Sequence, residues 1–189
     1  MLECMPTMVI DCKEIKLNEV DFSNCEELTL WHFNPPSHSF EELPEVKNVR
    51  VLRVYFTNAE SLSGLENLPY LKRLELDYCP KLTALDGIPD TLEFLMIEHA
   101  KKLSGHDRIK AAGKLRVLRL HECGNIESLS FLEYLPLLTE FRFVNTSVTD
   151  GNMQPLIDHR PKLTAVAFNN KRHYSHTLDK VLGELGITL

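Results

Sequence analysis

Two histidines near the C-terminus have a spacing that suggests metal binding. His173 and His176 are three residues apart. No cysteine or further histidine accompanies them, whereas a metal ion held by protein side chains takes three or four ligands. We therefore expect a structural role for this pair in the last turn of the chain, and the sequence predicts no metal ligand.

A second pair of histidines, His99 and His121, lies beside Glu98 and Glu122. Imidazole and carboxylate groups placed together can transfer protons during hydrolysis. A hydrolytic site also needs a nucleophile and an oxyanion hole, and the sequence indicates neither. The motifs GxxxxGK[ST], GxGxxG, HExxH and GxSxG are absent as well. We therefore predict no catalytic residue, no enzymatic activity and no cofactor, and interpret these side chains as solvated interface residues.

The charge balance and the cysteines restrict the possible partners. The 189 residues include 21 Lys and Arg against 27 Asp and Glu, a net charge of −6. Because nucleic-acid phosphates repel such a chain, we predict no nucleic-acid partner and favour a basic protein. Five cysteines without a CxxC motif indicate neither a disulfide framework nor a zinc site. The first thirty residues contain no uninterrupted apolar run, which predicts no signal peptide, no membrane contact and a cytoplasmic location.

The elements that must position these residues are repeats of the form L-x-x-L-x-L-x-x-N/C. Copies begin at residues 25, 49, 71, 92, 115, 138 and 163, so the steps are 24, 22, 21, 23, 23 and 25 residues. All fall within the roughly 20–29 residues typical of leucine-rich repeats. The alternating apolar residues of each copy are typical of a half-buried strand. No copy can bury its leucines alone, so we predict an α/β solenoid with a concave parallel sheet and a convex side of irregular and 3₁₀ segments.

The repeats also assign individual strands, ladder residues and convex segments. The predicted strands are centred on Leu28–Leu30, Leu52–Val54, Leu74–Leu76, Leu95–Ile97, Leu118–Leu120, Phe141–Phe143 and Val166–Phe168. The ninth residue ends each strand, and Cys79 and Cys123 at this position are interpreted as buried ladder residues rather than reactive thiols. Residues 101–114 have few apolar anchors, so we expect the most irregular convex segment there.

Both ends of the solenoid need a cover. Residues 1–24 are predicted to form an N-terminal cap, either a truncated repeat or a hairpin, with short strands at Met8–Ile10 and Ile15–Leu17. About seven repeats occupy residues 25–171, and residues 172–189 are predicted to form the C-terminal cap.

The C-terminal cap is expected to be a helix that completes a self-contained domain. Apolar residues recur at helical spacing from Leu178 to Leu185. Thr177 before them is a suitable N-cap residue, and Gly186 after them is a suitable stop.

The repeats resemble those of a known family. The stretch from Ser61 to Leu68, followed by Leu71-Lys72-Arg73-Leu74, is similar to internalin-type leucine-rich repeats of bacteria. The closing segments 146–151 and 171–176 resemble the end of small, unsecreted bacterial repeat proteins, some of which look like immunity proteins that neutralise a toxin. The absence of a signal peptide and of a cell-wall anchor motif argues against a host-surface adhesin.

The residues expected on the concave side offer a protein-binding surface. Counted from the first leucine of each copy, positions 3, 5, 7 and 8 project from the sheet. Aromatic and arginine side chains there are typical of interface centres, and carboxylates form an acidic stripe beside them. The predicted partner-binding residues are Trp31, Arg53, Tyr55, Phe56, Glu75, Asp77, Tyr78, Phe94, Glu98, Arg119, His121, Glu122 and Arg142.

The sequence therefore predicts a protein-binding scaffold that is monomeric when free. In its most concrete form, which the resemblance implies, it is an immunity-type protein that occludes a toxin; the acidic surface suits a basic toxin such as a nuclease. The alternative is an effector or adaptor that binds host or cellular signalling proteins through the same face.

Overall fold

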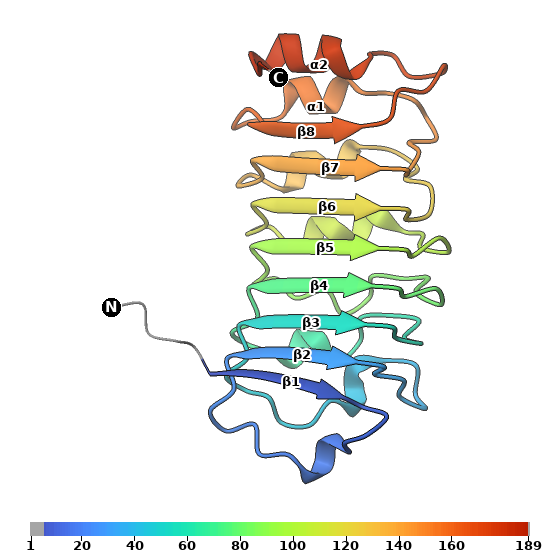
Figure 1. Ribbon diagram of the computed structural model, residues 1–189. Coiled ribbons are helices and arrows are strands. Elements are labelled where there is room, and N and C mark those ends of the chain that lie inside the picture. Colours follow the sequence, from blue (N-terminus) through green and yellow to red (C-terminus); the bar gives the residue numbers. More distant parts are fainter. Residues whose placement is uncertain (1–5, 189) are drawn as a thin grey trace.

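The computed structural model describes residues 6–188, so Cys4 lies outside the described range. These residues form one eight-stranded sheet in which the strands follow one another in chain order (Figure 1). The strands are β1 Thr7–Asp11, β2 Glu27–Trp31, β3 Val51–Tyr55, β4 Arg73–Asp77, β5 Phe94–Glu98, β6 Val117–His121, β7 Glu140–Val144 and β8 Ala165–Phe168. Every neighbouring pair is parallel. The predicted leucine-rich-repeat solenoid is confirmed, and all seven predicted strands are present as β2 to β8.

The inward side chains explain why the repeats stack. From β2 to β7 the second and fourth residues of each strand are buried, as Leu118 and Leu120 of β6 illustrate with exposures of 0% and 1%. They belong to one continuous core that runs from Ile10 to Leu185. Removing apolar surface from water along the whole array is the main stabilising contribution to this fold.

The other face of the sheet is covered by short helices and turns, as the repeat spacing predicts. The 3₁₀ helices are η1 Leu17–Glu19, η2 Phe40–Glu42, η3 Leu65–Asn67, η4 His106–Ala111 and η5 Ser130–Tyr134. Our expectation for residues 101–114 is wrong, because η4 is the longest 3₁₀ helix within residues 6–188. Gly105 precedes this helix in a left-handed conformation (φ 65°), and the buried His106 and Ile109 anchor it.

Of the two forms expected for the N-terminal segment, a truncated repeat and a hairpin, the structure does not show the hairpin. β1 lies parallel to β2 and extends the sheet, which the Met8–Ile10 pattern anticipated. The strand expected over Ile15–Leu17 is absent: a turn over residues 12–14 is followed by a bend at Ile15, and Leu17 begins η1. The segment therefore contributes one more parallel strand rather than a hairpin. The division of the chain into two caps and a repeat region stays a prediction.

The C-terminal helix has the expected boundaries. α2 spans Leu178–Leu185, where the Oγ1 of Thr177 accepts a hydrogen bond from the Lys180 N–H at 3.4 Å. Gly186 ends the helix in a left-handed conformation (φ 76°). A second helix, α1 Gln154–Asp158, was not anticipated. No helix among residues 6–188 has the length and apolar character needed to cross a bilayer.

The cysteines at the ninth repeat position are buried ladder residues. Cys79 is 0% exposed and Cys123 5% exposed. The Cys123 thiol donates to the carbonyl of Ile97 at 3.2 Å, and the Cys123 N–H donates to the Thr146 hydroxyl at 3.0 Å. Burial raises the pKa of Cys123 to about 12 and also raises the pKa of Cys79. Both side chains are therefore thiols at neutral pH and fill space in the core.

Candidate functional site

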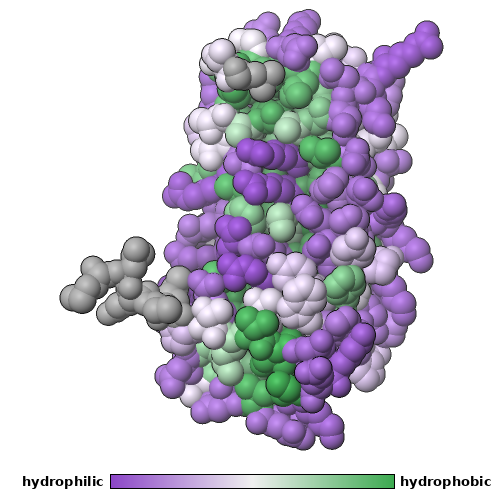
Figure 2. Space-filling model, in the orientation of Figure 1, coloured by the Kyte–Doolittle hydropathy of each residue, from purple (hydrophilic) through white to green (hydrophobic). Residues whose placement is uncertain are grey.

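The sheet has one face that the helices leave uncovered, which we call the open face (Figure 1). The first, third and fifth residues of each strand lie on it, because the second and fourth point into the core. Figure 2 shows hydrophobic and pale side chains gathered over the lower strands, with hydrophilic side chains around them. The open face is the surface that the sequence predicts as concave.

Four rings stack on one another at the carboxyl ends of the strands. His32, Phe56, Tyr78 and His99 each follow the last residue of a strand. Their ring centroids lie 5.4, 4.9 and 4.4 Å apart in this order, and each neighbouring pair is stacked. We call these four residues the aromatic ladder. Its spacing follows the distance of about 4.8 Å between neighbouring strands.

A repeated backbone turn builds this ladder. His32, Phe56, Tyr78 and His99 all have positive φ angles, between 53° and 58°. At most of these turns the backbone N–H donates to the last residue of the next strand; that of Phe56, for example, bonds the carbonyl of Asp77 at 3.0 Å. A left-handed conformation costs a bulky side chain about 1–2 kcal/mol. Ring stacking, at about 0.5–1.5 kcal/mol per pair, offsets part of this cost.

The predicted aromatic residues meet at the lower end of the ladder. The Trp31 ring stacks on Tyr55 with centroids 4.5 Å apart, and it also lies 5.9 Å from Phe56. Phe56 and Tyr78 remain 40% and 47% exposed. Exposed apolar side chains that cluster in this way mark interaction surfaces more often than isolated ones do.

A small pocket of about 260 Å³ adjoins the ladder. Its lining residues are Asn34, Phe56, Thr57, Asn58, Tyr78, Pro80 and Lys81. The buried Oδ1 atom of Asn58 has no hydrogen-bond partner among the described residues. The pocket therefore offers a partner side chain the surfaces of two aromatic rings, Phe56 and Tyr78.

Charged residues on the open face neutralise one another in two networks. In the first network, Arg53 contacts Glu27 at 3.0 Å and Glu75 at 3.3 Å. Arg73 forms a further close ion pair with Glu75, which is only 8% exposed. Because two guanidinium groups enclose the carboxylate, Glu75 holds the arginines in place instead of facing a partner directly.

The second network lies on the following strands. Glu140 accepts from the Nε atoms of Arg119 at 2.7 Å and Arg142 at 2.9 Å. The guanidinium groups of two arginines lie over the ring of Phe94. The Cζ atom of Arg73 is 3.6 Å from the ring centroid, and the Cζ atom of Arg119 is 5.4 Å from it. Phe94 begins β5, whereas the aromatic ladder lies beyond the strand ends, roughly 16 Å away along the strand. Phe94 therefore belongs to the arginine networks and not to the aromatic ladder.

Each carboxylate of the predicted acidic stripe has a basic neighbour. Asp77 bonds the Nδ1 atom of His99 at 2.8 Å, and Glu98 lies 3.9 Å from the Nδ1 atom of His121. Glu122 pairs with Lys101 at 3.2 Å. The hydrogen bond from Lys101 lowers the pKa of Glu122. Lys101 gives Glu122 a permanent positive partner, whereas the histidines beside Asp77 and Glu98 carry a charge only when protonated.

One group of side chains within residues 6–188 has the geometry of a metal site. Ligand atoms of Asp77, Glu98 and His99 all lie within 4.8 Å of one another. The pair that the spacing suggested is engaged elsewhere: His173 Nε2 lies 2.9 Å from the carbonyl of Val148, and His176 Nδ1 lies 2.9 Å from the hydroxyl of Ser175.

The predicted residue set missed several members of the site. It omitted His32 and His99, because nothing in the sequence indicated that their rings stack on Phe56 and Tyr78 of the neighbouring repeats. It omitted Val9, which is 65% exposed beside β2, because β1 matches no full repeat. The omitted members of the arginine networks are Glu27, Arg73 and Glu140. The alternation of strand residues places all three at position 3 on this face, but the predicted set did not include them.

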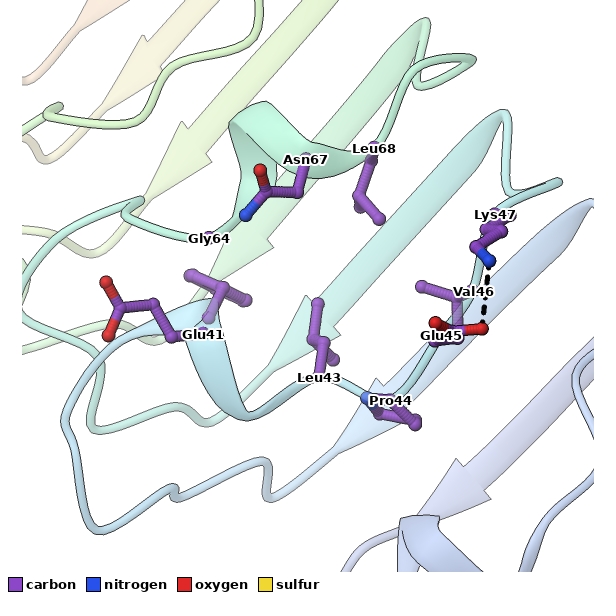
Figure 3. Close-up of a pocket in the computed structure, with 10 residues that line it drawn as sticks. Glu41, Leu43, Pro44, Glu45, Val46, Lys47, Gly64, Asn67 and Leu68 are labelled. Carbon is purple, nitrogen blue, oxygen red and sulfur yellow. Dashed lines mark ion pairs between the residues drawn. The ribbon is translucent and has the colours of Figure 1, made fainter.

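A further pocket lies away from the open face, among the segments that cover the sheet. Figure 3 shows it between η2, η3 and the chain from Leu43 to Lys47. Its volume is about 220 Å³. Apolar side chains form much of its wall, and a Lys47–Glu45 ion pair at 3.0 Å borders it. It contains no cluster of potential proton donors, acceptors and nucleophiles that would indicate catalysis.

Comparisons with known proteins add one structural likeness. No model of a protein family and no curated protein matches the chain. Among solved structures, the chain is similar to internalin C2 from Listeria monocytogenes, with 18% sequence identity and a TM-score of 0.41 over 66% of this chain and 73% of that chain. The fold assignment stands on the strand order and on the common register of the repeats. The chain therefore has a leucine-rich-repeat fold.

Proposed function

We propose that the protein is a non-enzymatic binding module that docks a partner protein on its open face. The observation that carries this proposal is the aromatic ladder with Trp31 and Tyr55 beside it. Rings at left-handed positions raise the free energy of the folded chain, and Phe56 and Tyr78 expose much of their surface to water. Contact with a partner would bury this surface and stabilise the bound state.

The dimensions of the open face suit a protein partner. Eight strands spaced by about 4.8 Å give a surface of roughly 34 Å. This span is comparable with the interface of a small protein domain. The ion pairs around Glu75 and Glu140 hold the arginines before binding, which reduces the conformational entropy lost on association.

In its most specific form, the proposal is an immunity-type protein of the bacterial cytoplasm that neutralises a toxin by occlusion. The resemblance of the closing segments to small unsecreted repeat proteins supports this form. The net charge of −6 favours a basic toxin domain, because opposite charges accelerate encounter. The free protein would then be a monomer with its open face accessible.

Affinity capture with matched variants tests the proposal. Wild type, Tyr78→Ala and Tyr134→Ala serve as baits; Tyr134 is a 55% exposed tyrosine of η5, away from the open face. The true partner is a protein recovered by wild type and Tyr134→Ala and depleted with Tyr78→Ala. A protein that is recovered equally well with Tyr78→Ala and is lost with Tyr134→Ala would contradict the proposal.

Two further measurements test the toxin form. Expression of the captured partner alone should arrest growth, and coexpression of this protein should restore it. The association rate should fall as salt increases if the partner is basic, since salt screens exposed charges. A harmless partner would reject the toxin form while leaving the binding function in place.

A further inference from the structure

We propose that Asp77, Glu98 and His99 form a binding site for a divalent transition-metal ion of the Zn²⁺ class, at the carboxyl edge of the sheet. Their ligand atoms converge within 4.8 Å. The site goes beyond partner binding and does not depend on it, since all three ligands belong to this chain.

The sheet register brings two carboxylates together. Asp77 and Glu98 are direct partners across β4 and β5, and their side chains are only 22% and 30% exposed. Like charges opposite each other on neighbouring strands destabilise a sheet unless a cation lies between them. An imidazole supplies one positive charge, and only when it is protonated. A divalent cation would neutralise both carboxylates while His99 stays uncharged.

The surroundings fix the orientation of the ligands. The His99 ring stacks on Tyr78 with centroids 4.4 Å apart, which limits its rotation. The Oδ1 atom of Asp77 also accepts from the Tyr78 N–H at 2.8 Å. His121 lies beside Glu98, with its Nδ1 atom 3.9 Å from the carboxylate. Supporting contacts of this kind hold metal ligands in position in known sites.

The ligand types indicate which metal fits. One imidazole nitrogen and two carboxylate oxygens are a set that Zn²⁺ accepts, whereas Mg²⁺ and Ca²⁺ favour oxygen ligands alone. Three protein ligands leave a fourth coordination position for water or for an incoming group. The side chains keep between 22% and 30% of their surface exposed, so this position is open to solvent.

An equivalent pair elsewhere in the sheet provides an internal control. Asp11 and His32 occupy the same repeat positions as Asp77 and His99, and the Nδ1 atom of His32 likewise lies 3.0 Å from the Asp11 carboxylate. Trp31 stands where Glu98 stands in the proposed site. The first pair therefore lacks the third ligand, and the proposal assigns metal binding to the second pair alone.

Calorimetric titration of the protein with Zn²⁺ alone tests the site. Wild type should bind one ion per chain, and Glu98→Gln should weaken binding by about tenfold or more. His99→Asn should have a similar effect, because asparagine tolerates the left-handed backbone that His99 adopts. Far-ultraviolet circular dichroism confirms that each variant is folded. His32→Asn, the matched control, should bind Zn²⁺ as wild type does.

The outcomes separate the site from its alternatives. No binding by folded wild type at about 1 mM Zn²⁺ would overturn the proposal. Binding that survives Glu98→Gln and His99→Asn would also overturn it, with His173→Ala then locating the ion at the C-terminal pair. Mg²⁺ should not compete at similar concentrations, and equal binding of Mg²⁺ would contradict the assigned metal class.

Discussion

The turns after the strands have the same backbone in both halves of the solenoid but different side chains. In the N-terminal half the left-handed position holds the four rings of the aromatic ladder. In the C-terminal half the equivalent residues are Glu122 and Asn145, also with positive φ angles of 50° and 54°. Asparagine accepts this conformation readily, whereas phenylalanine and tyrosine rarely do. The fold therefore does not require rings at this position, and their presence points to binding.

The largest expected effect concerns the core that both halves share. Leu118→Ala removes a fully buried side chain from β6 and should lower the free energy of unfolding by about 2–5 kcal/mol. Urea denaturation followed by circular dichroism measures this change. A loss below about half a kcal/mol would show that the inward strand residues do not carry the stability of the array.

The second-largest expected effect is a pH dependence of stability that comes from the buried His106, which lies outside the aromatic ladder. His106 is 3% exposed, neither of its ring nitrogens has a partner among the described residues, and burial lowers its pKa to about 4. The unfolded chain, with a histidine pKa of about 6.5, takes up a proton between pH 6.5 and 4 while the folded chain does not. Stability should therefore fall as pH falls through this window, by roughly 3 kcal/mol at its lower end.

Urea midpoints measured across this window for wild type and for His106→Leu check the assignment. The variant should retain more of its stability at low pH. If the pH dependence is the same in the variant, another group is responsible for it. His159 is such a group, because burial lowers its pKa as well.

A replacement in the ladder tests the comparison directly. Tyr78→Asn places at the exposed ring position the residue type found at Asn145. It should weaken partner binding by more than about 1 kcal/mol, because an interface ring is lost. Stability should change by less than about half a kcal/mol, since the relieved backbone cost and the lost stacking nearly cancel. Titration calorimetry and thermal melting give the two values, and unfolding of the variant would show that the ring is structural.

The reciprocal replacement has the smallest expected effect. Asn145→Tyr introduces a ring where no ladder neighbour can stack on it, because Glu122 precedes it in the array. The variant should lose about 1 kcal/mol of stability, the cost of a bulky left-handed residue. Partner binding should remain unchanged. A gain in stability would show that these turns favour rings for reasons unconnected with binding.

The repeat register predicted most of the fold, because the period of the leucines fixes strand, turn and neighbour together. The apolar pattern predicted β1 through Met8–Ile10, but it also placed a strand over Ile15–Leu17 that is absent. It missed η4 as well, because the flanking glycines suggested irregularity rather than helix boundaries. These errors share a cause: the local pattern did not include the packing that the neighbouring repeats provide.

The site was less predictable than the fold. Residue types placed Tyr55, Tyr78 and Arg53 on the open face, because alternation assigns faces. Alternation alone could not show that Glu75 is enclosed by arginines, since this depends on side-chain conformations of adjacent repeats. Alternation also could not show that Asp77, Glu98 and His99 lie together. Their ligand atoms come close because β4 and β5, about one repeat apart in the sequence, pair in this register.

Amide hydrogen exchange of the protein with and without its captured partner tests the central claim most directly. The account predicts that binding slows exchange in the turns that follow β2 to β5, where the ladder lies, and leaves η3 and η5 unchanged. Protection confined to η3 and η5, with the ladder turns exchanging as in the free protein, would contradict it.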